Sequence, residues 1–250
     1  MNVLVIGGTG VVGTHLMAYL AGRGHRPVAA ARSTGVDLVT GQGLARALED
    51  AVAVVDVSNS GYRDAPGMEA FFEKAGANLM RAEQDRGIRH HVVLSAIGAD
   101  RFESGYFRAK RRQEEIVADS DLPFTIVRSA PLFEYIYGII DEVSDRDAVR
   151  VPPVRMQPVA AEDVASALAG IVARPASGSV IEVVGPDTVR LPALAEEVLA
   201  ANGDDRRVIV DPDVPYFGAQ IPEEPLIGGV HPRFAPTSFE DWLRRSLEVA

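Results

Sequence analysis

Apolar positions along the first 130 residues follow two alternating periodicities. Short β-branched and aliphatic runs bounded by glycine or polar residues predict buried strands, whereas apolar residues spaced three and four apart predict helices. The strands are predicted over residues 2–6, 27–31, 35–39, 52–57, 91–95 and 124–128, and the helices over residues 14–23, 44–48, 68–86 and 106–118. Because strands that alternate with helices form a parallel sheet covered on both faces, the pattern predicts a doubly wound, Rossmann-like α/β fold.

The second half of the chain has a looser pattern. Prolines become frequent beyond Ser129, although residues 180–184 and 208–210 still have the pattern of strands. The proline-rich stretch 211–236 predicts a long ordered loop or lid, followed by a helix that carries Trp242 and Leu243 inward. We expect residues 1–250 to form a single domain, in which roughly residues 130–160 and 187–250 contribute a small C-terminal lobe that covers the substrate.

Composition narrows the classes of function. With 47% apolar residues the 250-residue chain can bury a sizeable core, and its formal charge of −10 argues against a nucleic-acid partner. The absence of cysteine excludes disulfides, thiolate nucleophiles and cysteine metal ligands, and the five histidines show no metal-binding spacing, so we expect no metal. No apolar run is long enough for a membrane span, and the N-terminus shows no basic leader. We therefore expect a cytoplasmic protein with a small-molecule substrate and no membrane partner, while the sequence indicates no oligomeric state.

A glycine cluster directly follows the first predicted strand. Residues 7–13, Gly-Gly-Thr-Gly-Val-Val-Gly, satisfy both G-x-x-G-x-x-G and G-x-G-x-x-G in a strand–turn–helix setting. In such a turn the first glycine permits the tight bend, the middle one lets the backbone approach a pyrophosphate, and the last allows close packing of the helix, whose N-terminus attracts the anion. This cluster predicts a dinucleotide site with the cofactor-binding residues Gly7, Thr9, Gly10, Val11, Val12 and Gly13.

The end of the second predicted strand indicates which dinucleotide binds. NAD usually needs a carboxylate here for the ribose hydroxyls, whereas NADP needs a cation for its 2′-phosphate. The strand ends in Arg32 and Ser33, a planar guanidinium and a hydroxyl suited to phosphate. We therefore expect NADP(H) rather than NAD(H), with a solvated arginine as the alternative interpretation.

Two further pairs are predicted to touch the cofactor. Asp37 and Leu38 are expected to flank the adenine, the carboxylate accepting a hydrogen bond from its amino group and the leucine packing on the ring. Ser58 and Asn59 follow the fourth predicted strand at the carboxyl edge of the sheet, where ligands of open α/β sheets bind. A plain turn at the end of the strand is the alternative for the second pair.

A phenol and an ammonium are placed for proton transfer. Tyr106 and Lys110 lie four residues apart on a predicted helix and so share one face. We expect the ammonium to lower the pKa of the phenol, which lets the tyrosine exchange a proton with a carbonyl or alcohol. Ser95, at the end of the fifth predicted strand, is expected to bind a substrate oxygen. The alternatives are a strand-terminal hydroxyl for Ser95 and an aromatic packing residue for Tyr106, and residues 114 and 115 are expected to form a solvated acidic face.

These segments resemble the short-chain dehydrogenase/reductase superfamily, specifically its atypical NmrA-like branch, over nearly the whole chain. The resemblance rests on residues 7–13, 94–99, 106–110 with Glu114, 123–128 with Pro131, and 158–165. It implies that Ser95 binds the substrate, that Tyr106 donates the proton, that Lys110 holds the nicotinamide ribose, and that residues 129–133, including Pro131, border the nicotinamide. The chain departs from the superfamily in lacking a clear counterpart of its helical asparagine, since Asn78 lies closer to Ser95 than that residue should.

Three functions remain open at this point. The first is an NADPH-dependent reductase acting on a carbonyl, imine or activated alkene; the second is an NmrA-like NADP(H)-binding redox sensor without catalysis; the third is a non-redox isomerase or cyclase. A mostly apolar or aromatic substrate is favoured by the predicted pocket walls, which are Phe133, Tyr135, Ile136, Tyr137, Met156 and the loop around Phe217.

Overall fold

A seven-stranded parallel sheet forms the centre of the molecule. The structure is a computed structural model that describes residues 1–61, 64–142, 145–221 and 225–249. The strands lie in the order β11-β8-β5-β4-β3-β1-β2. They are β1 (Asn2–Ile6), β2 (Arg26–Ala30), β3 (Ala53–Asp56), β4 (His91–Ala96), β5 (Phe124–Ser129), β8 (Val180–Val184) and β11 (Arg233–Phe234). Because β2 and β3 flank β1 on opposite sides, the order reverses at β1, and such a switch point is where open α/β sheets bind ligands. The predicted doubly wound fold is confirmed.

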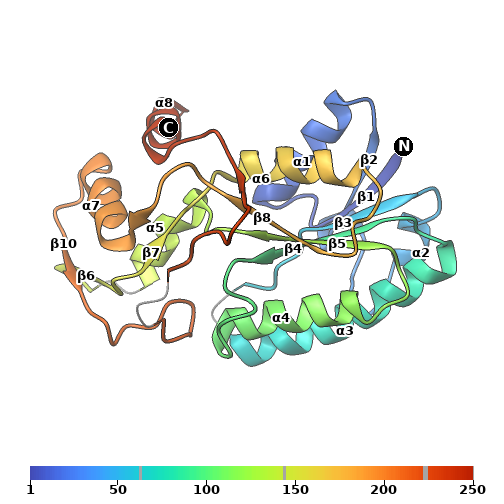
Figure 1. Ribbon diagram of the computed structural model, residues 1–250, viewed down its shortest axis with the longest axis horizontal. Coiled ribbons are helices and arrows are strands. Elements are labelled where there is room, and N and C mark those ends of the chain that lie inside the picture. Colours follow the sequence, from blue (N-terminus) through green and yellow to red (C-terminus); the bar gives the residue numbers. More distant parts are fainter. Residues whose placement is uncertain (62–63, 143–144, 222–224, 250) are drawn as a thin grey trace.

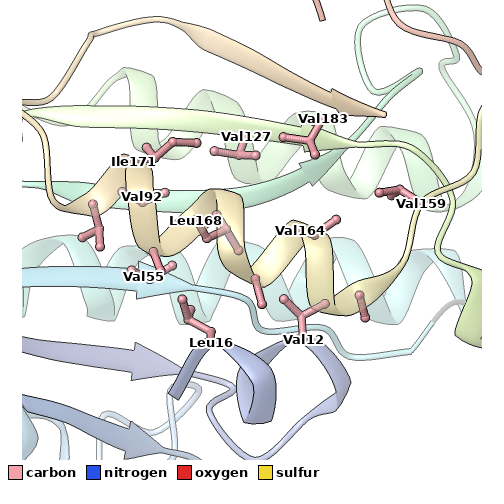
Figure 2. Close-up of a cluster of buried hydrophobic side chains, with 14 of the residues drawn as sticks. Val12, Leu16, Val55, Val92, Val127, Val159, Val164, Leu168, Ile171 and Val183 are labelled. Atoms are coloured by element: carbon pink, nitrogen blue, oxygen red, sulfur yellow. The ribbon is translucent and has the colours of Figure 1, made fainter. Parts of the chain in front are cut away.

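Helices cover both faces of this sheet. Helices α1 (Val11–Gly22) and α6 (Ala161–Val172) pack together on one face, and α3 (Ala65–Arg86) and α4 (Gly105–Ala118) on the other (Figure 1). Figure 2 shows Leu168 of α6 between Leu16 of α1 and the valines of the strands, among them Val55 and Val92. Burial on both faces explains why the strands have almost continuous apolar sequences.

A second group of elements packs beside the carboxyl edge of the sheet, at one end of the molecule (Figure 1). It comprises α5 (Phe133–Glu142), β6 (Ala148–Val151), β7 (Arg155–Met156), β9 (Val189–Arg190), α7 (Leu191–Ala201), β10 (Arg207–Val210) and α8 (Phe239–Val249). Its own core includes Ile136, Val149 and Leu194, and Trp242 and Leu243 of α8 pack against that core as the sequence predicts. That these elements act as a lobe over the substrate stays a prediction.

One predicted strand is wrong. Residues 35–39 form no strand but follow a single turn, η1 (Arg32–Thr34), and precede the short helix α2 (Leu44–Ala47). The Asp37 carboxylate accepts hydrogen bonds from the backbone N–H groups of Val39 (2.8 Å) and Thr40 (3.0 Å). Such a local side-chain to backbone turn competes with strand pairing, which the apolar alternation alone does not reveal.

The stretch 211–236 is largely loop, as predicted, but it also supplies β11. Arg233 and Phe234 pair in parallel with Val183 and Val184 of β8 and so extend the main sheet. Residues 222–224 within this stretch lie outside the described residues. No helix in the described ranges has the length and apolar character needed to cross a membrane.

Candidate active site

A cavity of about 580 Å³ lies at the carboxyl edge of the sheet, beside the switch point. Most of the predicted site residues line it: Gly7, Thr9, Gly10, Val11, Val12, Gly13, Arg32, Ser33, Ser58, Asn59, Ser95, Tyr106, Lys110 and Pro131. These residues come from the ends of five strands and the N-terminal halves of two helices, so the fold brings together groups that are far apart in the sequence.

The glycine turn has the geometry of a phosphate cradle. Gly7 has a φ of +77°, and its carbonyl accepts a hydrogen bond from the Gly10 N–H at 2.9 Å. A Cβ atom on Gly13 would lie 2.2 Å from the Gly7 carbonyl oxygen, so the helix approaches the turn too closely for any side chain there. Helix α1 begins without a side-chain cap and without an acidic residue in its first turn. Its first N–H groups are therefore available to an anion, which fits the pyrophosphate of a dinucleotide.

Arg32 and Ser33 lie at the edge of this cavity, and both are exposed. Arg32 makes no ion pair with any described residue, so its guanidinium is available for a phosphate. Asp37 and Leu38 are not among the described residues that line the cavity, because the Asp37 carboxylate is held in its own turn and Leu38 packs against a core cluster. The adenine contacts expected of this pair stay a prediction.

Asn78 secures the same loop and not the active site. Its side-chain amide donates hydrogen bonds to the carbonyls of Leu38 (2.9 Å) and Val39 (3.0 Å). Asn78 is therefore engaged by the backbone of residues 38 and 39.

Lys110 is buried at the inner wall of the cavity, with 3% of its surface exposed. Its Nζ donates a hydrogen bond to Gln113 Oε1 at 2.7 Å and lies 4.8 Å from the centre of the Phe72 ring. Gln113 in turn donates to Asp56 at the end of β3 (3.0 Å). Burial lowers the pKa of Lys110 to about 8, although Asp56 and Glu114 act in the opposite direction. The ammonium is thus held by a neutral amide in a largely apolar setting.

Tyr106 is partly buried among aromatic side chains. Its ring centre lies 5.6 Å from that of Phe217 and 5.8 Å from that of Phe107. Burial, and secondarily the neighbouring Tyr135, raise the pKa of Tyr106 above its ordinary value. The expectation that Lys110 lowers this pKa is therefore wrong, because the ammonium bonds to Gln113 and the apolar surroundings disfavour a phenolate. The Tyr106 phenol stays protonated and is suited to act as an acid.

Ser95 belongs to a buried ionic network. Its hydroxyl donates a 2.5 Å hydrogen bond to Glu114, which also accepts from Arg128 at 2.9 and 2.6 Å. Arg128 forms a second ion pair with Asp100 at 2.6 Å. The Ser95 proton is therefore engaged by Glu114, and the oxygen of Ser95 is left to accept and not to donate toward the cavity.

The network corrects the prediction of a solvated acidic face at residues 114 and 115. The Glu114 side chain is 8% exposed, whereas that of Glu115 is 47% exposed. Positions 106, 110, 113 and 114 recur at helical spacing, so one face of α4 carries all four side chains toward the sheet. From that spacing, the sequence could have predicted that Gln113 and Glu114 lie on the same helix face as Tyr106 and Lys110.

The predicted pocket walls are only partly correct. Tyr135 and the loop around Phe217 line the cavity, together with residues 129–132 that precede α5. Phe133, Ile136 and Met156 are instead buried in the C-terminal core, and Tyr137 is exposed outside the cavity. Within that loop Tyr216 also lines the cavity, although the sequence analysis did not single out its hydroxyl as a site group. No local spacing marks it, because its neighbours in the site come from distant segments.

No three acidic or histidine side chains gather in a metal-binding group within the described residues. The groups that line the cavity are instead backbone amides, hydroxyls, one lysine and aromatic rings.

Comparisons with known proteins identify the cofactor class. Residues 7–175 match the family described as NAD(P)H-binding. A curated relative, the photosystem II assembly factor Ycf39 of Synechocystis sp., is 29% identical over 153 residues, which cover 55% of this chain and 47% of the relative. The match thus spans about half the length of that protein.

Solved structures share the fold over the whole chain. MoeE5 in complex with UDP-glucuronic acid and NAD has a TM-score of 0.76 at 17% identity, with 99% of this chain and 98% of that one covered. dTDP-4-dehydrorhamnose reductase from Bacillus anthracis in complex with NADP has a TM-score of 0.75 at 13% identity, covering 100% and 99%. A short-chain dehydrogenase/reductase superfamily protein from Agrobacterium tumefaciens with bound NAD has a TM-score of 0.71 at 16% identity, covering 99% and 96%.

These likenesses confirm the fold inferred from the sequence. With the family match spanning the glycine turn, Ser95, Tyr106 and Lys110, the chain belongs to the NAD(P)H-binding family.

Proposed function

We propose that this protein is an NADPH-dependent reductase that acts on a carbonyl, imine or activated alkene of a small, mostly apolar or aromatic substrate. The observation that carries the proposal is the protonated phenol of Tyr106 in the wall of a cavity whose other end is a phosphate cradle. Because its pKa is raised, the phenol is protonated at neutral pH, which is the state from which it can donate a proton during reduction. Arg32, which is exposed and makes no ion pair with any residue that the structure describes, supports NADP(H) over NAD(H).

Each group in the cavity has a defined task in this proposal. The first turn of α1 and the glycine turn bind the pyrophosphate, Arg32 and Ser33 bind the 2′-phosphate, and Lys110 binds the ribose beside the nicotinamide. NADPH, when bound, supplies the hydride that reduces the substrate carbon. As negative charge develops on the substrate oxygen, Tyr106 gives it the hydroxyl proton, and the resulting phenolate regains a proton from water.

The test replaces Tyr106 by phenylalanine. Y106F keeps the ring packing and removes the acid, so we expect kcat to fall about 100-fold or more while NADPH affinity is unchanged. Oxidation of NADPH is followed spectroscopically with a panel of aromatic ketones, quinones and enones, and Y137F, which removes an exposed hydroxyl outside the cavity, is the matched control. Equal turnover by Y106F and the unaltered protein would remove Tyr106 from the mechanism.

A second candidate is an NADP(H)-binding regulator without catalysis. Two observations favour it: the curated relative is named as an assembly factor, and the Ser95 hydroxyl donates its hydrogen bond to Glu114 and not toward the cavity. In this case a partner protein binds one redox state of the complex more tightly than the other. Equal partner binding with NADP and with NADPH, together with turnover of any carbonyl probe, speaks against the regulator.

A further inference from the structure

We propose that Tyr216 is a second phenol of the substrate site, which donates a hydrogen bond to the same carbonyl oxygen that Tyr106 protonates. The inference rests on the proposed function and assigns the substrate-recognition group within it. Tyr216 is 2% exposed and lines the cavity, and its hydroxyl has no hydrogen-bond partner in the described part of the structure.

An unpartnered buried hydroxyl is unusual, because burial costs it the hydrogen bonds of water without replacing them. Two other buried side-chain atoms within the described ranges share this state, Nδ1 of His90 and Nε2 of His91. Neither histidine lines the cavity: the other ring nitrogen of His90 meets Thr125, and that of His91 meets Glu83. Of the three residues, Tyr216 is the one that lines the cavity, and we infer that a bound ligand supplies the partner of its hydroxyl.

The backbone around Tyr216 is built to hold this ring over the start of α4. Residues 216–219 form a tight two-residue turn in which the N–H groups of Tyr216 and Ala219 bond each other's carbonyls at 2.9 and 3.0 Å. Both central residues have positive φ, 49° at Phe217 and 75° at Gly218, as in a type I′ turn. A positive φ at phenylalanine is strained, and such strain concentrates at functional sites.

The turn is also fixed to the helix that carries Tyr106. The N–H of Tyr106 donates a hydrogen bond to the Phe217 carbonyl at 3.1 Å. Gly105, just before it, leaves no room for a side chain, since a Cβ there would lie 2.2 Å from the same oxygen. The two phenols are therefore placed by one connected piece of backbone, although 110 positions separate them in the sequence.

The substrate oxygen can accept one more hydrogen bond than Tyr106 supplies, and Tyr216 is suited to donate it. A carbonyl oxygen accepts two hydrogen bonds, and Tyr106 supplies one. Ser95, expected to supply the other, donates its hydrogen bond to Glu114 instead. Burial raises the pKa of Tyr216, so this hydroxyl is protonated and able to donate at neutral pH. Together with the rings of Phe107 and Phe217, this arrangement fits a carbonyl on a flat, apolar frame.

The experiment compares two ligands that differ only in the oxygen. The protein loaded with NADP⁺, which prevents reduction, is titrated with fluorenone and with fluorene by calorimetry. We expect Y216F to bind fluorenone about tenfold more weakly than the unaltered protein does and fluorene equally well, while Y137F changes neither. An unchanged preference for fluorenone in Y216F overturns the inference, as does a lack of preference in the unaltered protein, including failure to bind either ligand.

Thermal unfolding separates recognition from a structural role. Since the Tyr216 hydroxyl has no hydrogen-bond partner among the described residues, Y216F should melt no lower than the unaltered protein. Loss of a structural hydroxyl would instead lower the melting temperature. Failure of the proposed function looks different: fluorenone then binds through Tyr216, but no carbonyl probe is reduced. Conversely, reduction by Y216F with unchanged KM and kcat leaves the function intact and overturns this inference.

Discussion

The two ends of the cavity are constructed by different means. At the cofactor end, a continuous segment of thirteen residues forms a strand, a glycine turn and a helix start, and the ligand-binding groups are backbone amides. At the substrate end, side chains from α4, the segment before α5 and the turn at 216–219 converge from segments about a hundred residues apart. The first end depends on the absence of side chains, and the second on their chemistry.

This difference explains what each end tolerates. Backbone geometry cannot be adjusted by rotamer changes, so the cofactor end permits almost no substitution at its closest contacts. Phenols and rings at the substrate end can be exchanged while the fold persists, which allows one scaffold to serve several substrates. Four substitutions test the contrast, from the largest expected effect to the smallest.

Gly13→Ala should produce the largest loss of cofactor binding. The added Cβ would lie 2.2 Å from the Gly7 carbonyl oxygen, so α1 must move and the cradle opens. We expect NADPH affinity, measured by fluorescence titration, to fall about 1,000-fold, which corresponds to about 4 kcal/mol. Gly22→Ala, on the same helix with open space around it, is the control and should bind NADPH normally. Normal binding by both variants would show that the turn is not the rigid element described here.

Glu114→Ala should destabilise the fold where the two ends meet. The substitution leaves the guanidinium of Arg128, whose side chain is 12% exposed, with Asp100 as its remaining ion-pair partner. Removing one member of a buried pair costs about 3 kcal/mol in the free energy of unfolding, measured with urea. Glu115→Ala, at the neighbouring exposed position, should change it by no more than about 0.5 kcal/mol. If the two substitutions have similar effects on the free energy of unfolding, Glu114 is solvated, as the sequence predicts, and is not part of a buried ion pair.

Arg32→Ala should weaken NADPH binding without affecting NADH. A charge-assisted contact with the 2′-phosphate contributes about 2 kcal/mol, so we expect about a 30-fold loss for NADPH alone. Arg26→Ala, at the opposite end of β2 and also exposed, is the matched control. An equal loss of affinity for NADPH and NADH would mean that Arg32 stabilises the loop and does not bind the 2′-phosphate.

The same contrast explains how far the sequence could be interpreted. The strand–turn–helix at residues 2–22 was predictable because motif, periodicity and function lie in one continuous segment. A strand was wrongly predicted at residues 35–39 because the Asp37 side chain forms a local turn there. Glu114 was wrongly predicted to be solvated because the buried face of the helix continues past Lys110. The loop around Phe217 was predicted as a pocket wall, but the Tyr216 hydroxyl was not singled out, because its proposed role depends on a turn packed against Gly105, a contact that no sequence spacing encodes.

Lys110→Met should increase the free energy of unfolding, because the buried ammonium of Lys110 destabilises the folded protein. A pKa lowered from 10.5 to about 8 corresponds to about 3 kcal/mol of unfavourable burial at neutral pH, partly offset in the variant by the lost hydrogen bond to Gln113. We therefore expect K110M to unfold about 1–2 kcal/mol less readily near pH 7 while binding NADPH more weakly. Between about pH 8 and 10 the unfolded chain binds the extra proton, so the stability of the unaltered protein rises with pH across this window and approaches that of K110M. Urea unfolding near pH 7 and near pH 9 measures the difference, and a gap between the two proteins that stays constant with pH would contradict the burial of a charged Lys110.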